Sequence, residues 1–214
     1  MKNVLIISYY WPPSGGGGVQ RVVKFCKYLQ DYGWNPIVLT VEDGEFPVFD
    51  NSLVDDVKDI VCTKAKGFSL YSIFKKFTGK KNVPSHQISP SNGDTLITRL
   101  ARWIRFNLII PDGRIGWYRG ALKAGNEIIN DYNIDMIFTS GPPHSVHLIG
   151  NSLAKKTGIK WVTDFRDPWV DSFYYIENPR NKIISFFDNY LEKLVLRNCN
   201  YLITVSNGVL SLLN

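Results

Sequence analysis

Three short strings of glycines and polar residues each follow directly after a predicted β-strand. The first is Gly15-Gly16-Gly17-Gly18, the second extends from Ser140 to His147, and the third is Asp164-Phe165-Arg166-Asp167-Pro168-Trp169. Their residue types suit the binding of anions and hydroxyl groups. The carboxyl end of the first strand is where doubly wound sheets bind ligands, which favours a functional role for the glycine run.

The glycine run has the composition and the position of a phosphate-binding loop. Glycines let the backbone approach a ligand closely, and the helix predicted from Val19 offers free N–H groups and a positive dipole end. We expect Gly16, Gly17 and Gly18 to contact a phosphate, although a flexible turn has the same composition. No Lys-Ser or Lys-Thr follows, which excludes a P-loop, and Gln20 replaces the third glycine of G-x-G-x-x-G, which disfavours a dinucleotide dehydrogenase.

The second string places His144 at the start of a predicted helix, Ser145–Thr157. The positive end of a helix lowers the pKa of a histidine, so we expect a neutral imidazole with a hydrogen-bonding role. His147, one turn further on, is expected to be a packed helix residue. No Asp, Glu or Cys nearby completes a metal site with the two histidines, and we predict that no metal is bound.

The third string sets carboxylates on either side of an arginine, an arrangement that can hold sugar hydroxyls. Asp164, Arg166 and Asp167 would supply these hydrogen bonds, and Trp169 could stack on a pyranose ring. The alternative is an internal Asp–Arg pair that only fixes the loop. The residue types leave this choice open for Arg166 and favour a functional role for Asp164.

Short β-rich runs alternate with helical patterns along the chain, which predicts an α/β fold. The near-continuous apolar character of the strands indicates burial on both faces, as in a Rossmann-like doubly wound parallel sheet. The predicted strands are Val4–Ser8, Pro36–Val41, Val57–Cys62, Ile134–Thr139, Lys160–Thr163 and Tyr201–Val205. The predicted helices are Val19–Tyr32, Trp117–Asp131, Ser145–Thr157, Lys182–Asn198 and Ser206–Leu213.

The stretch from Thr63 to Arg114 breaks this rhythm and is interpreted as an insertion rich in basic and aromatic residues. Within it, the range 95–108 has the pattern of an amphipathic helix with a cationic side. Such a helix suits peripheral contact with an anionic membrane or a lipid-linked acceptor, and ordinary packing on the sheet is the alternative. The residues expected in this contact are Arg99, Arg102, Trp103 and Arg105. No RNP-like or OB pattern is present, so nucleic acid binding is not expected.

Length and composition indicate a single globular domain over residues 1–214. Apolar residues make up 44% and charged residues 21%, which excludes a disordered or fibrous class. The net charge of +6 allows anionic partners without choosing among them. The sequence has no apolar run of membrane-spanning length and no signal-peptide pattern, and its three widely spaced cysteines match neither a disulfide framework nor a zinc site. We expect a cytoplasmic protein whose membrane contact, if any, is peripheral.

Several strings resemble the amino-terminal half of bacterial family 4 glycosyltransferases, enzymes with the two-domain GT-B fold. The opening from Val4 to Phe25, which includes Tyr9-Tyr10-Trp11-Pro12-Pro13 and the glycines, resembles the first strand, loop and helix of those enzymes. The strings Pro111-Asp112-Gly113-Arg114-Ile115-Gly116-Trp117 and Thr163-Asp164-Phe165-Arg166-Asp167-Pro168-Trp169 resemble a subgroup linked to surface polysaccharide, or O-antigen, synthesis. Together the matches cover residues 1–41 and 108–206.

The resemblance implies a nucleotide-sugar donor, a saccharide or lipid-linked acceptor, retention at the anomeric carbon, and no cofactor or metal. It implies that the glycine loop meets the donor phosphate and that a histidine in the region of His144 contacts the donor or the reacting sugar. We expect His144 and Asp164 to be the catalytic residues and, from their residue types, Arg166, Asp167 and Trp169 to bind the acceptor. The family's carboxyl-terminal donor-binding domain, with its Glu-x7-Glu element, has no counterpart in this sequence, so we expect the isolated domain to be inactive. The alternative is a non-catalytic sugar- or anion-binding module, or a membrane-surface adaptor.

Overall fold

The computed structural model describes residues 1–44, 46, 48–67, 99, 103–104, 106–173, 175 and 179–213. Within them, strands form one parallel sheet in the order β3-β2-β1-β4-β5-β6. The strands are β1 (Lys2–Ile7), β2 (Trp34–Val41), β3 (Val61–Ala65), β4 (Ile134–Gly141), β5 (Lys160–Phe165) and β6 (Tyr201–Thr204). This arrangement confirms the predicted α/β fold with a doubly wound parallel sheet.

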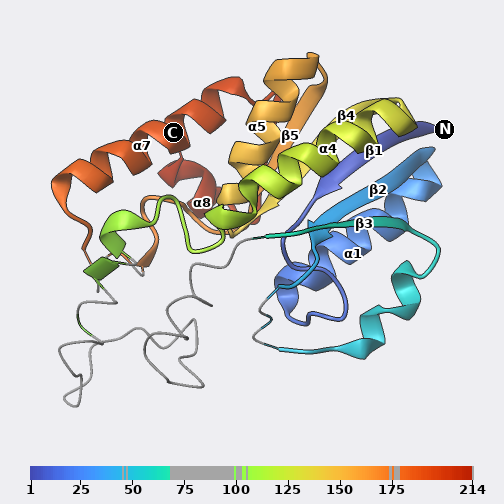
Figure 1. Cartoon of the computed structure of the whole chain (residues 1–214), viewed down its shortest axis with the longest axis horizontal. Coiled ribbons are helices and arrows are strands. Elements are labelled where there is room, and N and C mark those ends of the chain that lie inside the picture. Colours follow the sequence, from blue (N-terminus) through green and yellow to red (C-terminus); the bar gives the residue numbers. More distant parts are fainter. Residues whose placement is uncertain are drawn as a thin grey trace.

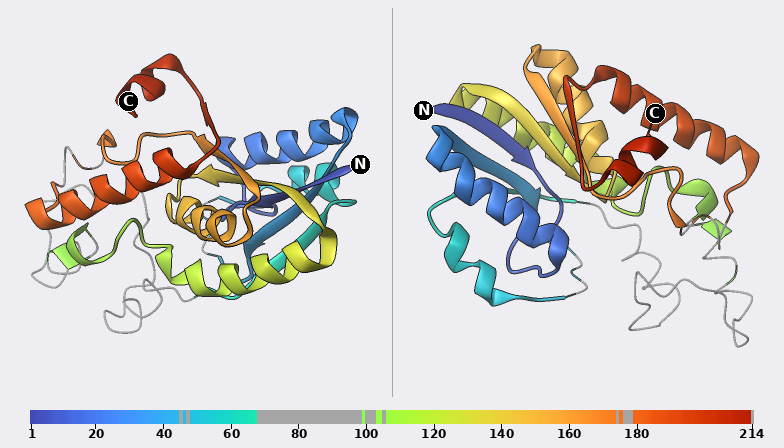
Figure 2. Two further views of the ribbon diagram at one scale, coloured as in Figure 1. Left: turned by 90° about the horizontal axis from the view of Figure 1, so that it is seen from above. Right: turned by 180° about the vertical axis from the view of Figure 1, so that it is seen from behind.

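Helices cover both faces of the sheet, as Figures 1 and 2 show. One face carries α1 (Gly17–Leu29), and the other carries α4 (Tyr118–Tyr132) and α5 (Ser145–Thr157). The chain continues through α7 (Lys182–Asn198), which contacts α5, and ends its described part with α8 (Asn207–Leu212). Short 3-10 turns are η1 (Gln30–Tyr32), η2 (Asn51–Leu53), η3 (Asp55–Val57) and η4 (Ile115–Trp117).

Alternation along the strands divides the core into two layers. In β1, Leu5 and Ile7 belong to the layer under α4 and α5, whereas Val4 and Ile6 belong to the layer under α1. All four side chains are almost fully buried. Successive residues of a strand point to opposite faces of the sheet. Neighbouring residues at the end of a strand therefore also point to opposite faces.

Helix α5 lies close to β4 because Gly150 faces the sheet. A Cβ atom at this position would lie 2.5 Å from Thr139 Cγ2 and 2.6 Å from Trp161 Nε1. The Trp161 indole donates a hydrogen bond of 3.0 Å to Thr139 Oγ1 in the same layer. This close packing fixes where α5 begins relative to the carboxyl end of β4.

The prediction for the third strand, Val57–Cys62, is wrong at both ends. Asp55–Val57 forms η3, and β3 runs from Val61 to Ala65, inside the range assigned to the insertion. As the edge strand, β3 takes its limits from pairing with β2, where Val61 lies opposite Ile37 and Ala65 opposite Val41. Apolar content, on which the prediction relied, is a poor guide at a sheet edge.

Helix α1 begins earlier than predicted, within the glycine run. Gly17 and Gly18 form its first turn, and Gly16 is the N-cap with a φ of +104°, a backbone conformation that favours glycine. The helix ends at Leu29 and continues as η1 up to Gly33. The glycines therefore build the helix start itself, and they do not form a separate loop before it.

The sheet order creates a switch point between β1 and β4. The chain proceeds from β1 toward β3 on one side and from β4 toward β6 on the other, and doubly wound sheets bind ligands outside the carboxyl ends of the strands at such a switch point. The glycine run follows β1, and the string from Ser140 to His147 spans the end of β4 and the start of α5. The fold thus brings two of the three strings to the place where ligands bind in sheets of this type.

The predicted amphipathic helix at 95–108 falls mostly outside the described residues, as do Arg102 and Arg105. Its described residues 99, 103, 104 and 106–108 are helical, and Arg99 and Trp103 are exposed. This segment is tied to the start of α7, since the Asn181 N–H donates to Asn107 Oδ1 at 2.8 Å. Among the described helices, none is long and apolar enough to cross a membrane.

Candidate functional site at the carboxyl edge of the sheet

The amino terminus of α1 is open. No side chain caps this helix, so the N–H groups of Gly17 and Gly18 have no intrahelical acceptor. Gly15, by contrast, donates its N–H to the Val48 carbonyl at 2.9 Å, which anchors the glycine run. A Cβ atom on Gly17 would have no heavy atom within 4 Å. The first turn of α1 therefore presents backbone donors and a positive dipole end to open space.

Arg166 lies directly beside this helix start. A Cβ atom on Gly18 would come within 3.0 Å of the Arg166 guanidinium, so only glycine allows the present contact without a shift. The guanidinium donates to Ser140 Oγ at 2.6 Å and to the Pro142 carbonyl at 2.5 Å. Burial lowers the pKa of Arg166, and nearby Asp164 and Asp167 raise it, but a guanidinium stays protonated near neutral pH.

Asp164 is fully buried and holds α1 against the sheet. Its carboxylate accepts hydrogen bonds from Arg21 Nε at 3.0 Å and from Arg21 Nη2 at 2.9 Å. Ser140 Oγ donates to Asp164 Oδ2 at 2.7 Å. Arg21 sits one turn after the glycines, so Asp164, Ser140 and Arg21 join β5, β4 and α1. The predicted internal Asp–Arg pair exists, but its arginine is Arg21.

The positive charge of Arg166 has a different surrounding. Both of its hydrogen-bond acceptors are neutral oxygen atoms, and in the described part of the chain no carboxylate oxygen lies within hydrogen-bond distance of it. Asp167, its neighbour, is exposed. Arg166 therefore adds a cation without a directly bonded carboxylate, among the described residues, to the open end of α1, which is an arrangement suited to a phosphate or another anion.

The amino terminus of α5 is closed by a carboxylate. Asp112 Oδ2 accepts from the Ser145 N–H at 2.8 Å, and Asp112 Oδ1 accepts from the Ser145 hydroxyl at 3.0 Å and from the Arg114 N–H at 2.9 Å. Burial raises the pKa of Asp112, and these hydrogen bonds oppose that rise. The positive end of α5 is thus already filled by the protein itself.

His144 is the N-cap residue of α5, as predicted, and it lies under the surface. Its ring stacks on Trp169 with centroids 5.0 Å apart and an interplanar angle of 9°. The pKa of His144 is lowered to about 3, chiefly by burial and then by the charge of Arg166. The low pKa agrees with the predicted neutral imidazole. Its main cause is burial, whereas the prediction attributed it to the helix terminus. His144 Nδ1 is buried with no hydrogen-bond partner among the described residues.

His147 is a packed helix residue, as predicted. It is fully buried, stacks on Phe165 with centroids 4.4 Å apart, and its Nδ1 lies 2.9 Å from Thr139 Oγ1. A Cβ atom on Gly141 would lie 2.5 Å from His147 Nε2, so the glycine leaves room for the ring. Burial first, and then His144, hold the pKa of His147 well below its usual range.

The position of Trp169 corrects the prediction that it stacks on a sugar ring. The side chain is fully buried, with His144 on its face, and its indole N–H donates to Asp188 Oδ1 at 3.2 Å. Asp188 also pairs with Arg180, which donates to the Pro111 carbonyl at 2.8 Å. The chain turns inward after Pro168, a tertiary effect that the local sequence does not reveal.

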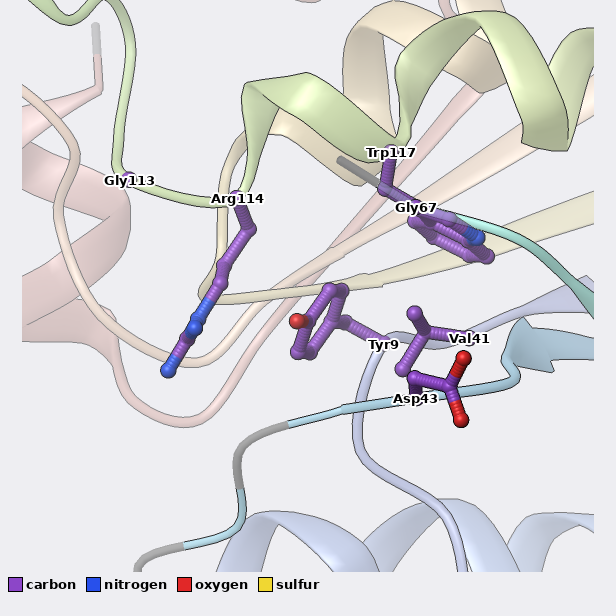
Figure 3. A pocket seen from close by; sticks show the side chains of 7 residues that line it. All are labelled: Tyr9, Val41, Asp43, Gly67, Gly113, Arg114 and Trp117. Carbon is purple, nitrogen blue, oxygen red and sulfur yellow. The ribbon is translucent and has the colours of Figure 1, made fainter. Parts of the chain in front are cut away.

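A small pocket of mixed polar and apolar lining lies beside the site, at the ends of β1, β2 and β3 (Figure 3). Figure 3 shows the Arg114 side chain running beside Tyr9, and its guanidinium carbon lies 5.2 Å from the centre of that ring. The pocket has room for about one water molecule, with a volume of about 10 Å³. Its lining residues are Tyr9, Val41, Asp43, Gly67, Gly113, Arg114 and Trp117.

The structure thus brings the glycines, Asp164 and Arg166 together and places His144 one layer below them. Arg99 and Trp103 belong to a different region of the chain. Sequence reasoning missed the roles of Arg21 and Asp112. The sequence shows Arg21 as a cation one turn into the helix and Asp112 within the string from Pro111 to Trp117. Their partners, Asp164 and Ser145, are distant in the sequence, so the pairing could not be predicted. In the described part of the chain, no three metal-binding side chains cluster.

Comparison with known proteins identifies relatives at the level of the fold. No family model matches the sequence, and no curated protein sequence is detectably similar. Sucrose-phosphate synthase from Thermosynechococcus elongatus aligns with a TM-score of 0.60 and 13% identity, over 99% of this chain and 44% of that chain. MurG from Acinetobacter baumannii aligns with a TM-score of 0.50 and 14% identity, over 96% of this chain and 42% of that chain.

Both of these proteins are GT-B glycosyltransferases, and the six-stranded sheet with its flanking helices matches their Rossmann-like architecture. The chain spans less than half the length of each. At this level of identity the likeness establishes the fold, and the chemistry has to be argued from the site.

Proposed function

We propose that this chain is the acceptor-side domain of a retaining family 4 glycosyltransferase. The enzyme would move a hexose from a nucleotide-sugar donor to a saccharide or lipid-linked acceptor in surface polysaccharide synthesis, with a second domain holding most of the donor. The observation that carries the proposal is the open start of α1 at the switch point of the sheet, beside Arg166. The Arg166 guanidinium has no directly bonded carboxylate among the described residues. The GT-B architecture supports it.

The chemistry assigned to this edge is electrostatic. When the sugar leaves its nucleotide, negative charge develops on the departing diphosphate. Donors fixed in place beforehand stabilise that charge without reorganising. The N–H groups of Gly17 and Gly18 and the Arg166 guanidinium are such donors, because the α1–β5 contact and the bonds to Ser140 and Pro142 hold them in place. No metal is required in this scheme.

The other predicted residues take different parts in the proposal. Asp164 is a positioning residue, since its carboxylate is buried and spent on Arg21 and Ser140. Asp167 is exposed beside Arg166 and is the carboxylate available to acceptor hydroxyls. His144 remains a candidate hydrogen-bonding group because it is held neutral and its Nδ1 is unpartnered within the described residues.

The first test measures binding of nucleoside diphosphates to the 214-residue chain. Uridine, guanosine and thymidine diphosphates are titrated in turn by calorimetry. Arg166→Gln should weaken the best of them by roughly 10-fold, because a charge-assisted hydrogen bond is worth about 1.5–3 kcal/mol. Lys160→Gln is the matched control, since Lys160 is an exposed cation at the other end of β5. If both variants lost the same affinity, the effect would come from the change in net charge and not from a contact made by Arg166.

The second test concerns transfer itself. In a protein that joins this chain to a donor-binding domain, Arg166→Gln should lower turnover by about 100-fold, as expected for loss of one preorganised donor. The anomeric configuration of the product, read by NMR, tests retention directly. An inverted product would reject the retaining assignment while leaving the anion site intact.

A second candidate function is a non-catalytic anion- or sugar-binding module. It is favoured by one observation: Asp164, the carboxylate predicted to act in catalysis, has no exposed surface and no free oxygen. A module of this kind would bind nucleoside diphosphates with the same Arg166 dependence. It would show no transfer in any context.

A further inference from the structure

The amino-terminal part of helix α7 turns apolar side chains outward, although Leu191, Val195 and Leu196 of the same helix pack on the core. The acidic residues Asp188 and Glu192 are buried, whereas Ile183, Phe186, Phe187 and Tyr190 are 50 to 70% exposed. A helix that packs on a sheet normally buries its apolar stripe and exposes its charges. The outward apolar side chains need an explanation outside the core.

The inward carboxylates are bound by other parts of the protein. Asp188 accepts from the Trp169 indole and pairs with Arg180, and Glu192 Oε2 accepts from the Val170 N–H at 3.0 Å. Trp169, Val170 and Arg180 thus hold α7 with its acidic side inward. As a result, the outward side of this helix carries no carboxylate.

The outward side is aromatic and cationic. Positions 183, 186, 187 and 190 follow the i, i+3, i+4, i+7 spacing of a single helix stripe, and the Phe186 and Phe187 rings touch edge to face at 5.8 Å. Lys182, Lys193 and Arg197 are all exposed and lie along one border of this stripe. The face therefore combines apolar rings with positive charge only.

Further exposed apolar side chains lie on the segment that is bonded to the start of α7. Trp103 and Leu108 are 52% and 62% exposed, and Ile104 is also exposed. The bond from the Asn181 N–H to Asn107 joins this segment to the first turn of α7. Figures 1 and 2 show α7 projecting past the carboxyl edge of the sheet, with its first turn next to the described helical residues 106–108. We call this combined surface, formed by Trp103, Ile104, Leu108, Ile183, Phe186, Phe187 and Tyr190, the aromatic face.

We propose that the aromatic face docks on an anionic lipid bilayer, with its rings at the level of the headgroups and with Lys182, Lys193 and Arg197 on the lipid phosphates. Amphipathic helices with large apolar side chains and a cationic border lie in the membrane interface in this way. Charge complementarity selects this occupant, because the acidic residues of α7 are turned inward and its bases outward. This inference does not depend on the proposed transferase activity.

The docking is tested by cosedimentation of the 214-residue chain with vesicles. One set contains phosphatidylcholine alone and the other phosphatidylcholine with phosphatidylglycerol at roughly 7:3. The wild type should bind the anionic set, and binding should fall at high salt because screening weakens the contact with phosphates. The double variant Phe186→Ser/Phe187→Ser should lower the bound fraction about 10-fold, and so should Lys182→Glu/Lys193→Glu.

The matched control changes exposed aromatics elsewhere. Tyr28, in the last turn of α1, is 53% exposed, and Tyr32, in η1, is 81% exposed. Like the aromatic face, they have lysines nearby, Lys24 and Lys27. Tyr28→Ser/Tyr32→Ser should bind the anionic vesicles like the wild type. Equal binding by the Phe186/Phe187 variant, or equal binding of wild type to both vesicle sets, would overturn the proposal. So would a dimer in sedimentation velocity that dissociates in the Phe186/Phe187 variant, since the face would then belong to a second copy.

Discussion

Helices α1 and α5 start at the same edge of the sheet, after the neighbouring strands β1 and β4, and their first turns are treated in opposite ways. The α5 start is filled by the Asp112 carboxylate. The α1 start has no cap, is built from glycines, and has a guanidinium beside it. Both helix ends carry the same backbone donors. The protein satisfies one internally and leaves the other for a ligand, which is the strongest structural argument for an anion site at α1.

The largest expected effect comes from breaking the contact that positions the open end. Asp164→Ala removes the buried acceptor of Arg21 and Ser140 and should lower the free energy of unfolding by about 3 kcal/mol, measured by urea denaturation. Asp56→Ala is the control, because Asp56 pairs with Lys24 and Lys27 on the exposed side of the same helix. Its effect should be much smaller. Similar losses in both variants would deny Asp164 a special role in holding α1.

A smaller loss is expected from opening the closed end. Asp112→Ala removes the cap of α5 and should cost about 2 kcal/mol of unfolding free energy, near the upper limit for caps. Asp112→Asn should recover part of this loss, because its amide oxygen still accepts from Ser145. Added sulfate should raise the melting temperature of Asp112→Ala more than that of Asp112→Asn, since only the former has a vacant helix end. No difference between them would weaken the comparison.

The histidine layer under the edge predicts a pH effect. The pKa of His144 is about 3 in the folded protein and 6.5 for an ordinary imidazole. Between these two pH values His144 is therefore protonated in the unfolded chain and neutral in the folded protein. Above pH 6.5 His144 is neutral in both states and does not lower the free energy of unfolding. As the pH falls toward 3, protonation of the unfolded chain lowers that free energy progressively. Between about pH 7 and about pH 5.5, His144 should account for a loss of roughly 1 kcal/mol.

The matched variant for this effect is His144→Phe, which keeps a ring against Trp169. Its stability should fall less steeply with acidification than that of the wild type, when both are followed by urea denaturation across this range. His147 retains its own contribution in both proteins. Parallel curves would show that His144 is not held neutral by the fold.

The smallest effect separates adjacent glycines at the open end. A Cβ at Gly18 would meet the Arg166 guanidinium at 3.0 Å, whereas a Cβ at Gly17 would meet nothing within 4 Å. Gly18→Ala should therefore cost up to about 1 kcal/mol and weaken diphosphate binding, while Gly17→Ala should be neutral or slightly stabilising. Calorimetry and urea denaturation check the two together. Equal behaviour of the pair would show that Arg166 does not depend on Gly18.

Much of the fold follows from local sequence patterns. Helices α5 and α7 have the predicted limits, and α5 ends where Gly158 adopts the left-handed conformation that favours glycine. The central strands were also placed correctly, because parallel strands buried on both faces have continuous apolar runs. Their limits were off by one or two residues: β4 ends at Gly141 and β5 at Phe165, two residues beyond the predicted ends. Edge strand β3 was misplaced since its limits depend on its partner β2.

The site was predicted less completely because its contacts join distant parts of the chain. The glycines and Arg166 could be found from composition and position, but the Arg21–Asp164 pair spans 143 positions. Trp169 resembles a sugar platform in its string, and only the fold shows that it packs on His144. The inward acids of α7 likewise depend on Trp169, Val170 and Arg180, which the helical pattern alone does not include.

The most direct test of the central claim follows backbone amides by ¹⁵N NMR while pyrophosphate is added. The amide signals of Gly17 and Gly18 should shift saturably, because their N–H groups are free. The signals of Gly15 and Ser145 should stay in place, because their N–H groups are already bonded to Val48 and Asp112. A saturable shift at Ser145, or none at Gly17 and Gly18, would contradict an anion site at the open end of α1.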